Sequence, residues 1–304
     1  MKIAISGGTG FIGKHLVSFF QKRGYQIFIL SRQSNIVSNS KNIHYVNWLT
    51  EHSNPEKYLE GIDVFINLAG TSIDSHWNEK TKIDIQESRI RATNEVIRII
   101  KGLKNKPKVL INASAIGIYG TSLEKVFTEK SDERGNDFLA DTVSKWEECV
   151  KKLEEPNVRV VLARFGVVLH PKEGALPKIA LPYQFFAGGP VGSGKQWISW
   201  VHIDEVVNLI SFAIEHEQIK GPINFTSPNP VTMNEFGQNL AKVLNRPHWL
   251  NTPSFLLKTI LGEKSMLVLE GQKVLPEKAM NNGYEFLYPT LQHALMNLYK
   301  GDKE

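Results

Sequence analysis

The chain has 304 residues, of which 41% are hydrophobic and 22% are charged, so a disordered chain is excluded and one large α/β domain, with or without a smaller lobe, is favoured. Its single cysteine, Cys149, excludes an internal disulfide bond and a cysteine-based zinc site, and it suits a reducing compartment, which we expect to be the cytoplasm. The formal net charge is +5 but the basic residues are scattered, and no run of about 18 apolar residues is present, so we expect neither a nucleic-acid nor a membrane partner.

The first half of the chain alternates short runs of β-branched residues with longer helical patterns. Helices are predicted at residues 11–23, 78–102 and 137–154. Strands are predicted at residues 2–6, 26–30, 43–46, 63–68, 108–112 and 158–163. Alternating strands and helices are joined by crossovers, which predicts a doubly wound parallel sheet with helices on both faces.

The second half is less regular. Residues 171–200 are rich in glycine and proline and are expected to form a loop, in which Trp197 and Trp200 either close over a ligand or anchor the C-terminal lobe. Helices are expected at 203–216 and 232–244, with a short strand at 222–225. We therefore predict a nucleotide-binding domain at 1–165 (plus about 195–216) and a smaller α+β lobe for the substrate at 166–194 and 217–304.

A glycine motif with the spacing Gly-x-x-Gly-x-x-Gly directly follows the first predicted strand and opens the first predicted helix. Glycine permits the tight turn and lets the backbone approach a pyrophosphate, which the free N–H groups and the dipole of the helix N-terminus attract. The residues expected to hold the diphosphate of a dinucleotide are Gly7, Thr9, Gly10, Phe11, Ile12 and Gly13.

The second predicted strand ends in Ser31-Arg32, and no acidic residue follows before Glu51. An NAD-specific site usually has an acidic residue at this place for the ribose 2′-hydroxyl, whereas a guanidinium can pair with a 2′-phosphate. The sequence therefore favours NADP over NAD, with a solvated loop charge as the alternative for Arg32. Leu68, Ala69 and Gly70 close the fourth strand, where small residues let the backbone pass the adenosine ribose.

The chain resembles the extended short-chain dehydrogenase/reductase superfamily, which includes nucleotide-sugar epimerases and dehydratases. The resemblance rests on the glycine motif and on the segments Asn67 to Gly70, Ser114 to Gly120 and Trp200 to Val206. It is closer to an atypical subgroup called epimerase-family proteins, which has a C-terminal domain of unknown function; the matching segments are Ser31-Arg32, Ser88-Arg89, Trp146-Glu147, Arg164 to Leu169, Gly188 to Gly194 and Gly271 to Pro276. This resemblance implies a Rossmann-type fold that binds NADP.

The resemblance also implies further cofactor contacts. The helix after Gly70 runs beside the cofactor in the subgroup, so Asp84 is expected at a ribose and Arg89 at a phosphate, with an ordinary charged helix face as the alternative. Gly166 and Val167 follow the sixth strand, where the nicotinamide end is expected. Members of the superfamily often pair through the helices near 80–100 and 138–154, which makes a homodimer possible.

The catalytic pattern of the superfamily is incomplete in this chain. Typical members use Tyr-x-x-x-Lys, whose phenol exchanges a proton with the substrate, together with a serine at the end of the fifth strand. Here Asp141 and Lys145 occupy the two slots of that pair, and the serine slot falls at Ala115 or Ser114. Lys145 is then expected at the nicotinamide ribose, or as a surface lysine. Two roles are left open for Asp141: it is either a catalytic residue or a solvated or helix-capping residue.

Tyr119, just past the fifth strand, is a second candidate proton donor, or else a packed aromatic residue. No metal site is expected. Two functions follow from these assignments. The first is an NADP-dependent oxidoreductase or epimerase-like enzyme acting on a small hydroxylated substrate, for which a nucleotide sugar is one candidate. The second is a sensor or scaffold that holds NADP(H) without turnover.

Overall fold

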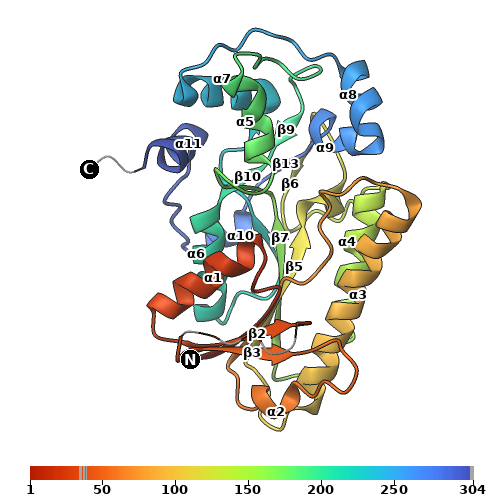
Figure 1. The fold of residues 1–304 in the computed structure, drawn as a ribbon, viewed down its shortest axis with the longest axis vertical. Helices are drawn as coiled ribbons and strands as arrows, with labels where there is room; N and C mark the ends of the chain where they lie inside the picture. The colour runs from red at the N-terminus through yellow and green to blue at the C-terminus, as the bar shows by residue number, and fades with distance from the viewer. Residues whose placement is uncertain (34–35, 37, 39, 302–304) are drawn as a thin grey trace. The chain divides into compact units, whose positions relative to one another are not determined.

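The largest sheet of the computed structural model, which describes residues 1–33, 36, 38 and 40–301, is a parallel sheet of seven strands (Figure 1). Across the sheet the strands are β11 (Gly221–Phe225), β7 (Arg159–Phe165), β5 (Val109–Ala115), β4 (Val64–Asn67), β1 (Lys2–Ser6), β2 (Gln26–Ser31) and β3 (Ile43–Asn47). The chain runs outward from β1 in both directions, so β1 and β4 flank the point where the strand order reverses. In open α/β sheets, ligands bind outside the carboxyl ends of the strands at this point.

The central strand β1 shows why the sheet forms here. Ile3, Ala4 and Ile5 are fully buried, because helices cover both faces of a parallel sheet. Ile3 lies beside Ile27 of β2 and beside Val64 of β4, so apolar side chains continue across the neighbouring strands. The predicted doubly wound parallel sheet is therefore confirmed.

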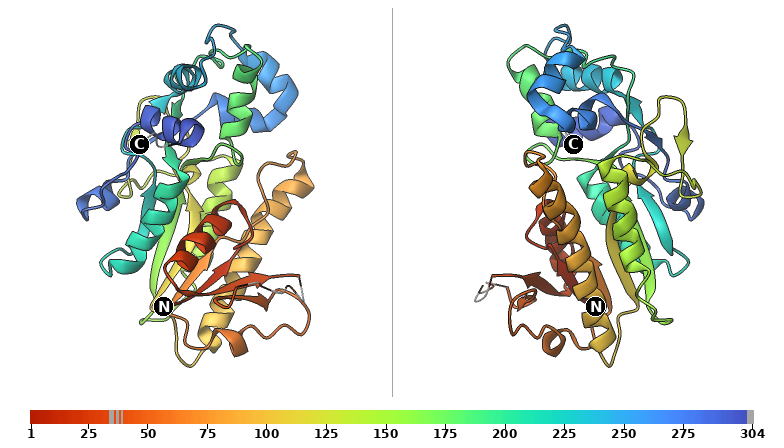
Figure 2. Two further views of the ribbon diagram at one scale, coloured as in Figure 1. Left: turned by 60° about the vertical axis from the view of Figure 1, so that its left-hand side comes forward. Right: turned by 90° about the vertical axis from the view of Figure 1, so that its right-hand side faces the viewer.

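Helices cover both faces of this sheet. Figure 1 shows α1 (Phe11–Lys22) and α6 (Ile203–Glu215) on one face and α3 (Glu79–Gly102) and α4 (Phe138–Val150) on the other. The helix α2 (Glu56–Leu59) is a single short turn. In Figure 2, α3 and α4 lie side by side. The predicted helices are confirmed, although α4 ends four residues earlier than expected.

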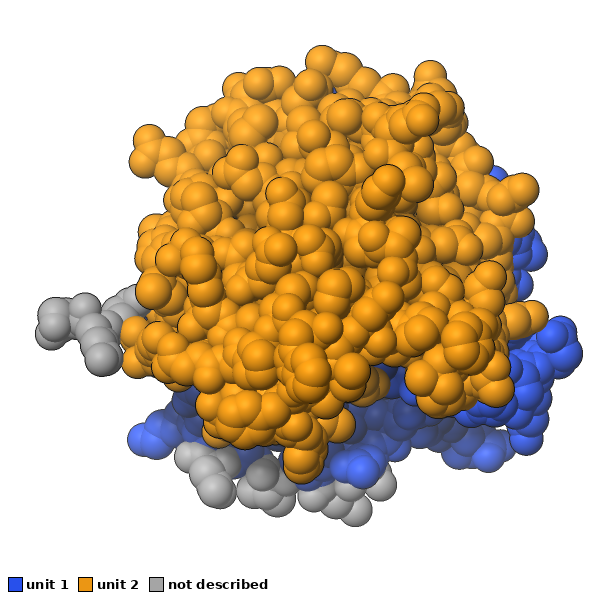
Figure 3. Space-filling view, turned by 90° about the horizontal axis from the view of Figure 1, so that it is seen from above, with its two compact units in different colours: residues 1–114, 141–164, 207–223 blue, residues 115–140, 165–206, 224–304 orange. Residues whose placement is uncertain are grey.

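The chain divides into two units, which Figure 3 colours separately. The first comprises residues 1–114, 141–164 and 207–223, and the second comprises residues 115–140, 165–206 and 224–304. Of the helices that the structure describes, none is both long and apolar enough to cross a membrane.

The second unit has its own apolar core and small two-stranded sheets. Its strands are β6 (Val126–Phe127), β8 (Val167–Leu169), β9 (Trp197–Ile198), β10 (Trp200–His202), β12 (Val231–Thr232) and β13 (Lys273–Val274). Its helices are η1 (Ile116–Tyr119), α5 (Leu176–Gln184), α7 (Met233–Leu244), α8 (Ser254–Leu261), η2 (Gly262–Ser265), α9 (Met266–Leu269), α10 (Glu277–Asn281) and α11 (Leu291–Lys300). Leu176, Trp200, Phe236 and Leu295 belong to one buried cluster.

The expectation that residues 171–200 form a loop is wrong in part, because α5 lies within this range. Pro177 falls in the first turn of α5, where proline costs no hydrogen bond because the first N–H groups of a helix have no partner within it. Pro182 lies inside the helix, near its end, and the chain leaves the helix within three residues. The prolines therefore led to the expectation of a loop where the chain forms a short amphipathic helix.

Candidate functional site

The glycine motif forms a narrow turn between β1 and α1. Gly7 has a φ of +73°, and a Cβ atom there would lie 2.9 Å from the backbone of Leu68. A Cβ atom on Gly13 would lie only 2.1 Å from the carbonyl oxygen of Gly7. Both positions therefore require glycine, one for its backbone conformation and the other for close packing of helix against turn.

The N-terminus of α1 is open to an anion. Gly10 caps the helix without a side-chain hydrogen bond, and the first turn contains no acidic residue. The N–H groups of Phe11, Ile12 and Gly13 lie in the first turn, where a helix offers no internal acceptor. Thr9 and Gly10 are exposed, so the turn is accessible to a diphosphate. These residues fit the phosphate-binding role that the sequence predicts.

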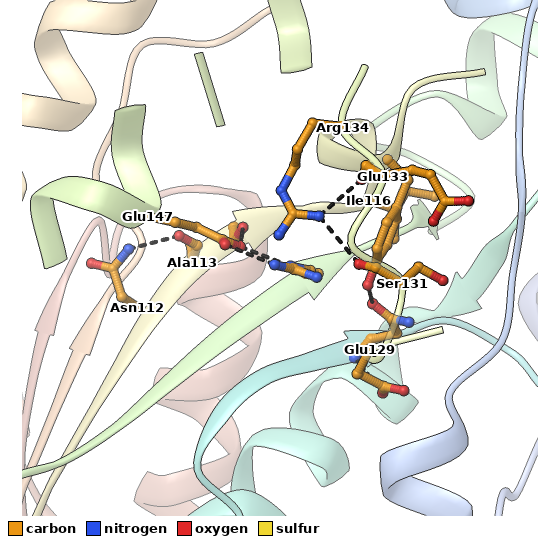
Figure 4. Close-up of polar contacts among 12 residues, drawn as sticks. Asn112, Ala113, Ile116, Glu129, Ser131, Glu133, Arg134 and Glu147 are labelled. Atoms are coloured by element: carbon orange, nitrogen blue, oxygen red, sulfur yellow. Dashed lines mark hydrogen bonds and ion pairs between the residues drawn. The ribbon is translucent and has the colours of Figure 1, made fainter. Parts of the chain in front are cut away.

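A buried chain of polar side chains fixes the strand ends next to this turn. The Ser6 hydroxyl donates to Asn67 Oδ1 (2.6 Å), and the Asn67 amide donates to Asn112 Oδ1 (2.6 Å) and to the Thr93 hydroxyl (3.1 Å). Asn112 in turn donates to the carbonyl of Ala113 (2.7 Å; Figure 4). Ser6, Asn67, Thr93 and Asn112 are fully buried, so the network ties β1, β4, β5 and α3 together at the carboxyl edge of the sheet.

The end of β2 carries the predicted adenosine contacts. Ser31 is paired with Asn47 of β3, and its hydroxyl accepts the N–H of Gln33 (3.1 Å), which turns the chain at the strand end. Arg32 is exposed, and within the described part of the chain its guanidinium has no ion pair. The side chain is thus available to a ligand phosphate.

Helix α3 supports the turn that follows β4. Arg89 Nη1 donates to the carbonyls of Ile85 (2.8 Å) and Thr71 (3.0 Å), and Ser88 Oγ accepts the N–H of Thr71 (2.9 Å). A Cβ atom on Gly70 would lie 3.0 Å from Arg89, so glycine makes room for the guanidinium. Burial lowers the pKa of Arg89 to about 10, so this cation remains charged at neutral pH beside Leu68, Ala69 and Gly70. Asp84 is exposed on the same helix.

Asp141, Lys145 and Gln86 form a small polar cluster between α3 and α4. Lys145 Nζ donates to Asp141 Oδ2 (2.7 Å), and the Gln86 amide donates to the same oxygen (3.0 Å). The hydrogen bond from Lys145 is the main reason that the pKa of Asp141 is lowered. An ionised carboxylate has no proton to donate, so this geometry argues against Asp141 as a general acid. The cap of α4 is Asp137, which accepts the N–H groups of Leu139 and Ala140.

Ser114 belongs to a buried ion pair. Its hydroxyl donates to Glu147 Oε1 (2.6 Å), and Arg164 holds both oxygens of that carboxylate, through Nε and Nη2 at 2.8 Å each. Ser114, Glu147 and Arg164 are buried near the ends of β5, α4 and β7. Figure 4 shows the polar contacts of Glu147. The hydroxyl proton of Ser114 therefore points to a protein carboxylate.

The remaining predicted residues lie in the second unit. Tyr119 is buried, its hydroxyl donates to Asn224 Oδ1 (2.8 Å), and its ring stacks on Phe127. A Cβ atom on Gly166 would lie 2.3 Å from the carbonyl of Ser199, and the same carbonyl accepts the N–H of Val167 (2.8 Å). Close backbone packing is thus sufficient to explain why position 166 is a glycine. The roles of Tyr119, Gly166 and Val167 toward a ligand stay predictions.

The two tryptophans of the predicted loop differ in burial and in their hydrogen-bond partners. Trp200 is fully buried and its indole donates to the carbonyl of Asn229 (3.1 Å), which fits an anchor of the second unit. Trp197 is half-buried, donates to the carbonyl of Leu123 (2.8 Å), and has Lys273 Nζ at 4.5 Å from its ring centre.

Sequence reasoning missed Gln86, the Glu147–Arg164 pair and the Asn67–Asn112 network as parts of this region. One signal was present: Ser6, Asn67 and Asn112 interrupt apolar strand patterns with a polar residue near the same strand end. Buried polar residues in such a pattern need partners, and neighbouring strands supply them.

Comparison with known proteins gives concordant findings. The model of the NAD dependent epimerase/dehydratase family matches residues 3–225, and a domain of unknown function (DUF1731) matches residues 252–298. Epimerase family protein YfhF of Bacillus subtilis (strain 168) is 50% identical over 298 residues, which cover 98% of each chain. Epimerase family protein SAR0825 of Staphylococcus aureus (strain MRSA252) is 41% identical over 297 residues, 97% of each chain.

Two solved structures are also similar. Human epimerase family protein SDR39U1, crystallised with NADPH, has a TM-score of 0.87 at 29% identity over 99% of both chains. The nucleoside-diphosphate sugar epimerase of Corynebacterium glutamicum has a TM-score of 0.77 at 29% identity, over 99% of this chain and 58% of that one.

Proposed function

This chain belongs to the NAD dependent epimerase/dehydratase family, and on that premise we propose that it binds NADP(H) and acts as an oxidoreductase or epimerase-like enzyme on a small hydroxylated substrate. The observation that carries the proposal is the glycine turn, which places a helix N-terminus without a side-chain cap hydrogen bond beside the strand-order switch. A bound nicotinamide supplies hydride transfer, and the protein supplies position and electrostatics.

Different residues of the first unit are proposed to contact different parts of the cofactor. In this proposal the backbone N–H groups of Phe11 to Gly13 hold the diphosphate, and the turn at Leu68 to Gly70 passes the adenosine ribose. Arg89 adds positive charge beside that turn, and Asp84 meets a ribose hydroxyl. Lys145, oriented by Asp141 and Gln86, holds the nicotinamide ribose.

NADP is proposed over NAD because of Arg32. Its exposed guanidinium, at the end of the strand next to β1, suits a 2′-phosphate, and no acidic residue is present there to accept a 2′-hydroxyl. The NADPH in the crystals of the human relative supports the same choice.

Replacing Arg32 by aspartate is expected to weaken NADPH binding about 100-fold, because a charge-assisted pair to phosphate is lost and a repulsive charge is added. NADH binding is expected to change less than threefold. Both affinities can be measured by quenching of tryptophan fluorescence. Lys41→Asp is the matched control, since it makes the same change of charge at an exposed lysine. Equal losses for NADPH and NADH in Arg32→Asp would contradict the assignment.

The substrate is proposed from the relatives rather than from a particular side chain. The Corynebacterium relative is described as a nucleoside-diphosphate sugar epimerase, which supports a nucleotide sugar as the first class to test. We assign substrate recognition to the second unit, including Tyr119, Gly166 and Val167. Cytoplasmic location and a homodimer through α3 and α4 complete the proposal; the single cysteine supports the former.

A second candidate function is an NADP(H) sensor or scaffold without turnover. It is favoured by the hydrogen bonds of the three candidate proton donors. Asp141 is ionised against Lys145, the Ser114 hydroxyl donates to Glu147, and the Tyr119 hydroxyl donates to Asn224. Steady-state assays with NADPH and a panel of carbonyl compounds and nucleotide sugars separate the two functions. Tight NADPH binding with no turnover across the panel favours the sensor.

Replacing Asp141 by asparagine is expected to weaken NADPH binding by no more than about fivefold, since an exposed ion pair contributes about 0.2–1 kcal/mol. Any turnover should persist, whereas loss of a general acid would lower it by about 10²–10⁴-fold. The pKa of Asp141 is lowered, so its pairing with Lys145 should hold above the ordinary carboxyl pKa and disappear only as the pH falls through the lowered value. NADPH titrations between pH 3 and 8 test this, with Glu148→Gln as control. A collapse of turnover in Asp141→Asn would restore Asp141 as the acid.

A further inference from the structure

The second unit exposes large apolar side chains from two separate segments. We call them the apolar patch and define it as Phe185, Phe186, Trp249, Leu250, Phe255 and Ile260. Their exposed fractions run from 46% for Leu250 to 74% for Phe185. Helix α8 contributes two of them and buries none of its eight residues, although five of the eight are apolar. Single exposed apolar residues are ordinary, but a contiguous group of this size marks an interaction surface.

Hydrogen bonds join the two segments into one surface. The Trp249 indole donates to the carbonyl of Phe186 (2.9 Å), and the N–H groups of Trp249 and Leu250 both donate to Gly188. Further along, Thr252 donates to the carbonyl of Pro190 (2.8 Å), two residues before α8 begins. The chain after α5 and the chain before α8 therefore run together, which brings Phe185 and Phe186 close to Trp249 and Leu250.

Positive charge borders the apolar patch. Segments 176–192 and 241–267 contain five lysine or arginine residues and one acidic residue, Glu263. The Arg246 guanidinium lies 4.5 Å from the centre of the Phe186 ring, and Lys258 is exposed on α8 itself. Next to Arg246 is a hollow of about 600 Å³, whose lining includes Lys242, Arg246, His248 and amide side chains but no acidic residue.

From this arrangement we infer that the apolar patch docks on an anionic phospholipid surface. Exposed aromatic and aliphatic side chains bordered by lysine and arginine are typical of segments that lie in a membrane interface. The apolar side chains enter the boundary between headgroups and acyl chains, while Lys242, Arg246 and Lys258 meet the headgroup phosphates. This contact involves no membrane-spanning helix, and it differs from the sequence-based expectation that the chain has no membrane partner.

Charge decides between a lipid surface and a second copy of the chain. A symmetric dimer through the apolar patch would gather the basic residues that border it on both copies at one interface, with Glu263 as the one acidic residue of these segments, and this disfavours pairing. An anionic bilayer instead offers opposite charge to every basic residue around the patch.

Co-sedimentation with vesicles tests the inference. The full-length protein is expected to bind vesicles of phosphatidylcholine mixed with phosphatidylglycerol at low salt, and to bind pure phosphatidylcholine far more weakly. Lys242→Gln combined with Lys258→Gln should weaken binding about 25-fold, at about fivefold for each basic residue. Phe185→Ser combined with Phe255→Ser should weaken it about 100-fold, at about tenfold for each ring.

Matched controls are available in the first unit. Tyr58→Ser removes an aromatic side chain that is 64% exposed, and Lys80→Gln removes an exposed lysine. Both should bind vesicles like the unchanged protein, and all variants should keep its thermal unfolding. Binding no stronger to anionic than to neutral vesicles overturns the inference, as does equal loss in the controls. Sedimentation equilibrium tests the alternative that a second copy of the chain occupies the patch. If the protein does not bind vesicles but forms a dimer that Phe255→Ser dissociates, the patch is a dimer interface and the inference is overturned.

Discussion

Replacing Glu147 by alanine is expected to lower the free energy of unfolding by about 3–5 kcal/mol, because it leaves the buried Arg164 cation without its carboxylate. Arg164 and Glu147 are nearly inaccessible to water, and two hydrogen bonds of 2.8 Å join them. The same change removes the acceptor of the Ser114 hydroxyl, which is also buried. Urea unfolding followed by circular dichroism measures the loss.

The neighbouring residue supplies the control. Glu148→Ala removes an exposed carboxylate from the same helix and is expected to change the free energy of unfolding by less than about 0.5 kcal/mol. Replacing both partners, Glu147→Leu with Arg164→Met, should recover most of the loss, since an apolar pair pays no desolvation penalty. A loss below about 1 kcal/mol in Glu147→Ala would show that water reaches Arg164, contrary to its burial.

The sheet and the phosphate-binding turn could be predicted because their signals are local. Ile3 to Ile5 is a continuous apolar run, as a strand covered on both faces requires, and the glycines follow it at once. Gly7 and Gly13 are fixed by backbone geometry within seven residues of chain. Such features depend little on the rest of the fold.

The polar interior could not be predicted in the same way. Glu147 and Arg164 are 17 residues apart, and nothing in either local pattern shows that α4 brings one against the end of β7. Gln86 reaches Asp141 from 55 residues away, and this contact changes the expected chemistry of Asp141 from a possible acid to an ionised partner of a lysine. Contacts across helices depend on rotation and register, which periodicity gives only approximately.

The largest loss of NADPH affinity is expected from a substitution in the glycine turn. Replacing Gly13 by alanine is expected to lower NADPH affinity more than 100-fold and to destabilise the fold by about 1–3 kcal/mol. The new Cβ atom would lie 2.1 Å from the Gly7 carbonyl oxygen and 2.7 Å from Gly8 Cα, and both are backbone atoms that cannot rotate away. The turn must open, which displaces the N–H groups of α1 that the diphosphate needs.

Fluorescence titration with NADPH, at a temperature where the unfolding curve shows the variant folded, separates affinity from stability. Gly102→Ala is the matched control, because its Cβ atom would meet only the flexible side chain of Glu56, at 3.5 Å. That variant should bind NADPH with unchanged affinity. Unchanged NADPH affinity in folded Gly13→Ala would mean that the diphosphate does not contact this turn, since an alanine cannot enter the turn without moving its backbone.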